Sequence, residues 1–303
     1  MTAAARYVLG LDGGYTGALG LLASESGTIV AEARAAGASL QTHGEHQVEA
    51  LLAEVVDELG GLEPLSAVCI GLAGIERPQD ETVVRNILKR LGYRERAQVV
   101  NNAVVALVAG SAERVGIALL AGMGAIAYGI DRSGRTARAG GLGPLLSDEG
   151  SNYWLGCAAL RAAVRGSDGR GPQTALTPMV FSSFGAASAL EMLPVAYERG
   201  LSRLQIAALA AAVQKAAERG DAVAEQLLES AAGELACAAR AVAERLEFDA
   251  PYPLVMAGSA FGACPDLVAR VSRRLELPLA RPARLEVEAA TGAVTLALEL
   301  LRA

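Results

Sequence analysis

Two glycine-broken hairpins constrain the fold more than any other feature of this sequence. The first covers residues 7–22 and the second covers residues 115–130. In each, two apolar runs flank a tight turn with two or three glycines, and a Ser-Gly pair and a third short segment follow. This repetition predicts two related lobes, each of which begins with short strands joined by tight turns.

Each of the two turns is suited to binding an anion. Gly13 and Gly14 stand in the first turn, and Gly122 and Gly124 stand in the second. Because glycine has no Cβ, the backbone N–H groups of such a turn can approach phosphate oxygens closely. Two such turns that face each other across a cleft would hold a polyphosphate, so the sequence predicts that the chain handles a nucleotide.

The order of the predicted elements indicates a mixed α/β fold with two lobes. In the first half we expect strands at 7–12, 17–23, 28–34, 66–72 and 99–100, and helices at 44–60, 77–91 and 103–110. In the second half we expect strands at 116–121, 125–130, 135–139 and 254–257, and helices at 152–164, 263–275 and 286–301. We therefore place one lobe at 1–110 and the other at 111–303, with a helical insertion at about 173–246. The last helix, within 286–303, is a candidate to pack on the first lobe.

Composition excludes several classes of function. The chain has 303 residues, of which 52% are hydrophobic, and its net charge is −6. We expect a large core and neither a nucleic-acid nor a membrane partner, since no dense basic patch is present. The apolar stretch 115–130 is too short to span a bilayer comfortably. No signal peptide pattern opens the sequence, so we expect a cytoplasmic protein.

Several familiar motifs are missing. The only lysines, Lys89 and Lys215, do not follow a glycine-rich loop, which excludes the GxxxxGK[ST] phosphate loop. The four cysteines (Cys69, Cys157, Cys237 and Cys264) form no CxxC pair and lie far from His43 and His46. A zinc or haem site is therefore not expected. We interpret the cysteines as small buried residues and the histidines as exposed or capping residues.

Asp12 is the single residue that points most directly to chemistry. It ends an apolar strand and precedes Gly13, Gly14 and, after one more residue, Thr16. A carboxylate at the end of a buried strand is costly unless it meets a cation or hydrogen-bond donors. Beside a phosphate-binding turn it would hold Mg²⁺, directly or through water. The alternative is that Asp12 caps the hairpin turn.

The segment 139–156 is the most specific run of the chain. Its glycines allow close backbone approach, and Asp148 and Glu149 stand at the start of a predicted helix, near Trp154. Acidic residues at such a position often cap the helix. A carboxylate with backbone donors around it is also well suited to binding sugar hydroxyls, and both interpretations stay open on composition alone.

Taken together, the motifs resemble one known family. They are Asp12-Gly-Gly-x-Thr, Gly71-Leu-Ala-Gly74, Asn101-Asn-Ala-x-x-Ala-Leu107, Ala121-Gly-x-Gly124, Gly140-Gly-x-Gly-x-x-x-x-Asp-Glu-Gly-Ser151 with Trp154, and Ala257-Gly258. In this order they resemble the N-acetylglucosamine kinase and BadF/BadG-type ATPase family, within the actin-like sugar kinase superfamily. The resemblance runs from about residue 7 to the C-terminus, and its most specific part is the segment 140–154.

The resemblance implies two ribonuclease-H-like lobes with ATP and Mg²⁺ in the cleft between them. It implies an ATP-dependent kinase acting on an amino sugar such as N-acetylglucosamine or glucosamine, with Asp12 and Asp148 as catalytic residues and Asp12 at the Mg²⁺. The implied ATP-binding residues are Gly13, Gly14, Tyr15, Thr16, Gly122, Met123, Gly124, Ala125, Gly258 and Ser259. The implied substrate-binding residues are Gly74, Gly141, Leu142, Gly143, Asp148 and Glu149.

The sequence departs from the family at several polar positions. Asn102 stands where the family has the aspartate base, and an amide cannot take the proton of a sugar hydroxyl. Met123 and Ala125 stand where hydroxyl side chains are usual, and Tyr15 replaces a glycine. A general base contributes roughly 10²–10⁴-fold to a rate. We therefore expect a slowed kinase in which Asp148 or solvent takes the proton.

Two alternatives to this prediction remain at the level of sequence. The chain could be a catalytically degenerate protein that binds a nucleotide or a sugar. It could also be an ATPase activator of a dehydratase, but such activators need paired cysteines for an iron–sulfur cluster, and no pair is present. For the assembly, a homodimer is the expectation from the frequency of such dimers.

Overall fold

The computed structural model describes residues 6–62 and 65–303 of the chain. It divides into two compact units, one with the described residues up to Ala118 together with Leu285–Ala303, and one with Leu119–Arg284. The chain leaves the first unit within β6 (Gly116–Ala121), later than the predicted boundary at residue 110. Both ends of the described chain therefore belong to the first unit.

The first unit contains a five-stranded sheet with the order β3-β2-β1-β4-β5. Its strands are β1 (Tyr7–Gly13), β2 (Gly17–Ser24), β3 (Ile29–Ala36), β4 (Leu65–Leu72) and β5 (Arg96–Asn101). Strand β2 runs antiparallel to both β1 and β3, whereas β1, β4 and β5 are parallel. The carboxyl ends of these three parallel strands therefore meet at one edge of the sheet.

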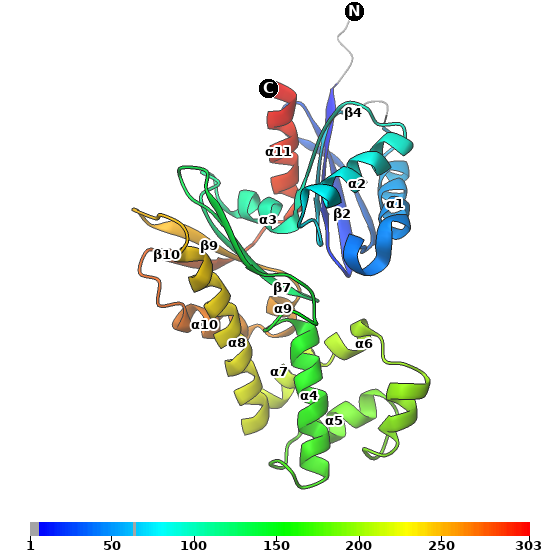
Figure 1. Cartoon of the computed structure of the whole chain (residues 1–303), viewed down its shortest axis with the longest axis vertical. Helices are drawn as coiled ribbons and strands as arrows, with labels where there is room; N and C mark the ends of the chain where they lie inside the picture. Colours follow the sequence, from blue (N-terminus) through cyan, green and yellow to red (C-terminus); the bar gives the residue numbers. More distant parts are fainter. Residues whose placement is uncertain (1–5, 63–64) are drawn as a thin grey trace, which may run out of the picture. The chain divides into compact units, whose positions relative to one another are not determined.

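Helices cover both faces of this sheet (Figure 1). They are α1 (Leu40–Glu58) and α2 (Pro78–Arg90) on one face, and α3 (Asn102–Gly110) and α11 (Ala290–Arg302) on the other. Successive side chains of a strand point to opposite faces. Leu9 and Leu11 accordingly pack with α1 and α2, while Val8 packs with α3 and α11.

Close backbone contact fixes the C-terminal helix to the first unit. A Cβ on Gly10 of β1 would collide with the backbone at Val294 of α11, and a Cβ on Gly292 would collide with Val105 of α3. Only glycine allows these approaches. Strand β1, which carries Asp12 at its end, is therefore held directly against α11.

The second unit has its own five-stranded sheet, with the order β10-β9-β6-β7-β8. Besides β6, its strands are β7 (Ala125–Ile130), β8 (Thr136–Gly140), β9 (Tyr252–Ala257) and β10 (Ala280–Arg284). Its helices are α4 (Asn152–Ser167), α5 (Leu176–Ser183), α6 (Arg203–Ala207), α7 (Ala210–Ala217), α8 (Ala222–Ala243), α9 (Ala260–Ala263) and α10 (Asp266–Arg274), with a π-helical turn at Pro194–Glu198. The predicted helix 263–275 is wrong in its start, because it is split into α9 and α10 around Pro265. Strand β10 escaped prediction.

Candidate active site

Asp12 lies at the end of β1, opposite Gly71 of the parallel strand β4. Its Oδ1 atom is buried and has no hydrogen-bond partner. Burial, and then the nearby charge of Glu288, raise the pKa of Asp12 to about 7. A turn-capping role would have supplied backbone donors to this atom. An unpartnered buried carboxylate oxygen beside a second carboxylate instead fits a cation, so the residues present are compatible with Mg²⁺.

The first glycine turn is closely supported by the segment that follows β3. Within the turn, the Gly14 N–H donates to the Gly17 carbonyl at 2.9 Å. The ring of Tyr15 packs against the imidazole of His43, with 4.5 Å between the centroids. His43 Nδ1 in turn accepts the N–H of Ser39 at 3.1 Å. The predicted capping role of a histidine is confirmed for His43, and it positions Tyr15.

The structure brings the predicted base position to the same sheet edge as Asp12. Leu72 of β4 pairs with Asn101 of β5, so α3 begins where these parallel strands end. Asn101 caps α3 by accepting the Ala103 N–H at 2.9 Å. Asn102 is the first residue of the helix and is half-buried. The neighbouring Asn101 therefore has a structural role, and Asn102 stays the predicted base position.

Gly74, a predicted substrate-binding residue, lies just beyond the end of β4. Its φ of +85° is in the left-handed region, and a Cβ there would lie 3.0 Å from Ser39 Oγ. Both the backbone conformation and the close packing require glycine at this position. Within the first unit, Asp12, Gly74 and Asn102 thus follow or end three adjacent parallel strands.

In the second unit, Asp148 packs directly on the glycine turn between β6 and β7. Its Oδ1 accepts the Ala125 N–H at 3.2 Å. A Cβ on Gly124 would lie only 2.8 Å from Asp148 Oδ2. Asp148 is 7% exposed, and burial raises its pKa despite the hydrogen bond from Ala125. The Ala125 N–H, expected to face ATP, is therefore already engaged by Asp148.

Asn152, the first residue of α4, contacts the same turn and was not predicted as a site residue. Its backbone N–H donates to the Gly122 carbonyl at 2.9 Å, and its Nδ2 donates to Ser259 Oγ at 3.2 Å. The residue is only 7% exposed, and its Oδ1 is buried without a hydrogen-bond partner. Gly258, with φ of +108°, packs against the Ala121 backbone. The predicted ATP residues Gly122, Gly258 and Ser259 are thus assembled around one unsatisfied acceptor.

The loop that carries the other predicted substrate residues is attached to this turn. The Gly141 N–H donates to the Ala125 carbonyl at 2.8 Å. The Leu142 N–H donates to Ser147 Oγ at 2.8 Å, while the Leu142 side chain is 52% exposed. Gly143 has a φ of +88° and Glu149 is exposed. The loop therefore presents Leu142 and Glu149 to solvent and Asp148 to the turn.

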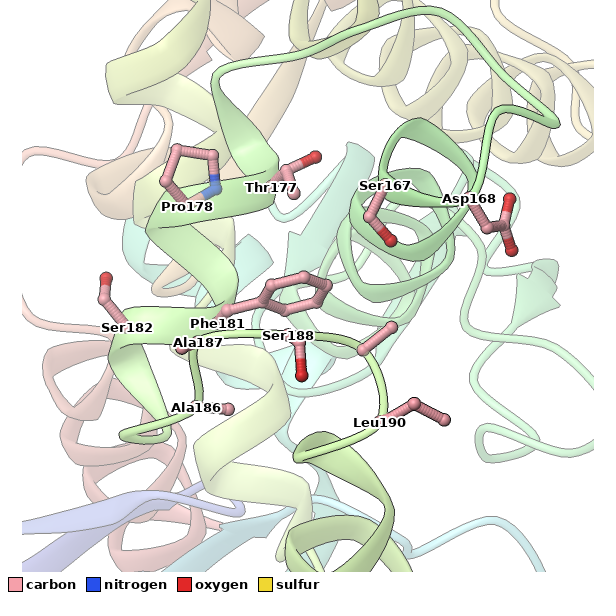
Figure 2. Close-up of a pocket in the computed structure, with 11 residues that line it drawn as sticks. Ser167, Asp168, Thr177, Pro178, Phe181, Ser182, Ala186, Ala187, Ser188 and Leu190 are labelled. Carbon is pink, nitrogen blue, oxygen red and sulfur yellow. The ribbon is translucent and has the colours of Figure 1, made fainter.

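A separate cavity of about 600 Å³ lies within the helical insertion (Figure 2). Its walls are the end of α4, helix α5 and the segment 186–190, and the ring of Phe181 points into it. The predicted site residues are not among those that line it. This cavity is therefore distinct from the groups that surround Asp12 and Asp148.

The cysteines differ in their burial. Cys69 and Cys264 are buried as expected, but Cys157 is half-buried and Cys237 is exposed, which corrects the prediction for these two. Among residues 6–62 and 65–303, no group of three or more His, Cys, Asp or Glu side chains could hold a metal ion. In the same ranges, no helix combines the length and apolar character needed to cross a membrane.

Comparison with known proteins decides the family. The model of the BadF/BadG/BcrA/BcrD ATPase family matches residues 9–297. The chain belongs to this family. A relative from Clostridium acetobutylicum, named N-acetylmuramic acid/N-acetylglucosamine kinase, is 34% identical over 246 residues, which is 80% of each chain. The N-acetyl-D-glucosamine kinase of Dictyostelium discoideum is 27% identical over 267 residues, or 82% of this chain and 84% of its own.

A solved structure gives the same result for the fold. The crystal structure from Chromobacterium violaceum, described as an N-acetylglucosamine kinase, superposes with a TM-score of 0.77 and 25% identity, covering 98% of this chain and 99% of its own. The predicted family and the α/β fold with two lobes are therefore confirmed. Membership of an ATPase family also confirms ATP as the cofactor. The relatives favour a sugar kinase over both a degenerate binding protein and a dehydratase activator.

Proposed function

We propose that this chain is an ATP-dependent kinase that phosphorylates an amino sugar such as N-acetylglucosamine or glucosamine. The observation that carries the proposal is the buried carboxylate of Asp12, whose Oδ1 has no hydrogen-bond partner, at the edge where β1, β4 and β5 end. A protein keeps such a group when a ligand satisfies it. The kinase names of the relatives from Clostridium and Dictyostelium supply the reaction class.

Asp12 would hold Mg²⁺, either directly or through a bound water. The bound ion would neutralise charge on the phosphates during transfer. The raised pKa of Asp12 fits this role, because a cation restores the charged form that burial disfavours. In the first turn, the backbone N–H groups of Tyr15 and Thr16 would face the phosphates. The N–H of Gly14 is engaged by the Gly17 carbonyl, so Gly13 and Gly14 would contribute by allowing close backbone approach.

In the second unit, the turn of Gly122, Met123, Gly124 and Ala125 would contribute further phosphate contacts. Since the N–H groups of Gly122 and Ala125 are engaged internally, those of Met123 and Gly124 are the ones we assign to phosphate. Gly258 and Ser259 would lie near the nucleoside. The unpartnered Oδ1 of Asn152 needs a hydrogen-bond donor, which a nucleotide hydroxyl would provide.

Asp148 would orient the sugar by accepting hydrogen bonds from its hydroxyl groups. The carboxylate is held by the Ala125 N–H at 3.2 Å and so has a fixed position. Gly74, Gly141, Leu142, Gly143 and Glu149 would complete the substrate-binding set. Fixed acceptors are favoured here, because misplacement of a substrate by about 1 Å can cost about 10²-fold in rate.

The test is sugar-dependent ADP release from ATP and Mg²⁺ with N-acetylglucosamine, glucosamine, N-acetylmuramic acid and glucose. We expect release with at least one amino sugar and its loss in Asp148→Asn. The matched control is Asp249→Asn, which changes a carboxylate that is 83% exposed and should leave the rate unchanged. Binding of ADP and sugar without any turnover would instead support the degenerate binding protein, and Asn102 would then be its cause.

The remaining features of the proposal follow from the reaction. Because ATP and small sugars are the substrates, we expect the enzyme to act in the cytoplasm and to need no nucleic acid or membrane partner. A homodimer stays a prediction, which the mass of the purified protein in solution would check.

A further inference from the structure

The reaction needs a proton acceptor that Asn102 cannot be. When a sugar hydroxyl attacks phosphorus, its proton must leave, and a neutral amide does not take it. Near this sheet edge, Asp12 is assigned to the cation. Asp80 is 3% exposed and is engaged by Arg77 and by two backbone N–H groups, and the side-chain bond from Arg77 holds its pKa below the usual range. Asp80 is thus committed to starting helix α2.

Glu76 is a carboxylate near Asn102, the position where the predicted base is replaced by an amide. It is half-buried and follows the predicted substrate residue Gly74 by two positions. Its Oε1 accepts a hydrogen bond from Asn101 Nδ2 at 3.0 Å, and Asn101 directly precedes Asn102. Its backbone N–H donates to Asp80 Oδ2 at 3.1 Å, which fixes the start of the segment that carries it.

Asn101 is itself a rigid anchor for this carboxylate. Its Oδ1 caps α3 through the Ala103 N–H at 2.9 Å, so the direction of its Nδ2 is set by the helix. The same Nδ2 also contacts the Ile75 carbonyl at 3.3 Å. A capping side chain thus holds one oxygen of Glu76 at the N-terminus of α3, next to the residue that precedes Asn102.

We propose that Glu76 is the general base of this kinase and replaces the function lost at Asn102. The inference rests on the proposed function. In the step, the sugar oxygen forms a bond to the γ-phosphorus while the bond from that phosphorus to the bridging oxygen of ADP breaks, and the electron pair stays on ADP. The hydroxyl proton passes to the Glu76 carboxylate and then to solvent. A weakly basic carboxylate suffices, because the transition state of phosphoryl transfer is loose and needs little help from the base until late.

The test compares Glu76→Gln with the double variant Glu76→Gln, Asn102→Asp. Glutamine keeps the oxygen that accepts from Asn101, so sugar binding measured by calorimetry should stay within a few-fold of the parent. We expect kcat of Glu76→Gln to fall by about 10²–10⁴-fold with little change in KM. The added aspartate should restore kcat to the level of the parent chain. Glu95→Gln, at an exposed position before β5, is the control and should have no effect.

The outcomes separate the two proposals. An active parent with an equally active Glu76→Gln overturns the assignment of Glu76. So does a slow Glu76→Gln that the added aspartate does not rescue, because Glu76 would then act through structure alone. A parent chain that makes no sugar phosphate from any amino sugar contradicts the proposed function itself.

Discussion

At the scale of single residues, burial of the Asp12 carboxylate destabilises the folded protein at neutral pH, and the cation that we propose would offset this cost. Its native pKa of about 7 lies above the ordinary value of 3.8, so between these pH values the folded state binds more protons than the unfolded state. The free energy of unfolding contributed by this group therefore falls as pH rises from 3.8 to about 7 and stays low above that.

Asp12→Asn removes this pH dependence. Without metal, the variant should unfold a few degrees higher than the parent at pH 8, and the difference should vanish near pH 4, as measured by thermal unfolding. The same variant should weaken Mg²⁺-dependent binding of ADP by about 10- to 100-fold, since a metal-orienting group is lost. If Asp12→Asn and the parent had equal thermal unfolding midpoints at pH 8 and equal ADP affinity, burial of Asp12 would not be destabilising and Asp12 would not bind a cation.

The candidate site residues differ in how readily they could be predicted from the sequence. Asp12 was predictable because a charged group that ends an apolar run is unusual. Asn152 was not, since its importance depends on contacts with Gly122 and Ser259, which are far away in the chain. Glu76, which we propose as the base, was missed for a similar reason, because only its contact with Asn101 brings it near the predicted base position at Asn102.

At the scale of elements, the second glycine turn and the loop that carries Asp148 form one structural assembly. Gly124 has no left-handed backbone, so its only need for glycine is the contact with the Asp148 carboxylate at 2.8 Å. Gly124→Ala should therefore displace Asp148 and lower kcat/KM for the sugar by up to about 10²-fold. The measurement is steady-state kinetics with the sugar as the varied substrate.

A matched substitution gives the control for this prediction. Gly233 lies inside α8, where a Cβ would meet only Arg274 Nη1, at 3.9 Å. Gly233→Ala should leave kcat/KM unchanged and stabilise the protein by about 0.5–1 kcal/mol, because alanine is the better helix residue. Equal activity of Gly124→Ala and Gly233→Ala would mean that the carboxylate of Asp148 is not positioned by the turn.

Most elements were predictable because their apolar residues are periodic. The three strands that open each unit follow from alternating and continuous apolar runs, and α8 buries a regular stripe that includes Leu228 and Leu235. Strand β10 was missed because it lies at the sheet edge and contains Arg281 and Pro282, which are residues that edges tolerate. Local sequence could not reveal it, since its pairing with β9 alone makes it a strand.

At the scale of the whole molecule, the first unit combines the two ends of the described chain, because the C-terminal helix packs on the N-terminal sheet. Helix α11 packs against β1 and α3 through Gly10 and Gly292, which admit no side chain. The sequence predicted that this helix packs on the first lobe, and the structure includes it in the first unit. The residues that it contacts could not be predicted, because these contacts join segments nearly the full length of the chain apart. The family match over residues 9–297 covers residues of both units.

The most direct measurement is ³¹P NMR of the purified chain with ATP, Mg²⁺ and N-acetylglucosamine or glucosamine. Our account predicts a phosphomonoester signal of a sugar phosphate that grows as the γ-phosphate signal of ATP declines, and its absence in Asp148→Asn. A spectrum in which ATP persists with both sugars, or in which only inorganic phosphate appears, would contradict the account.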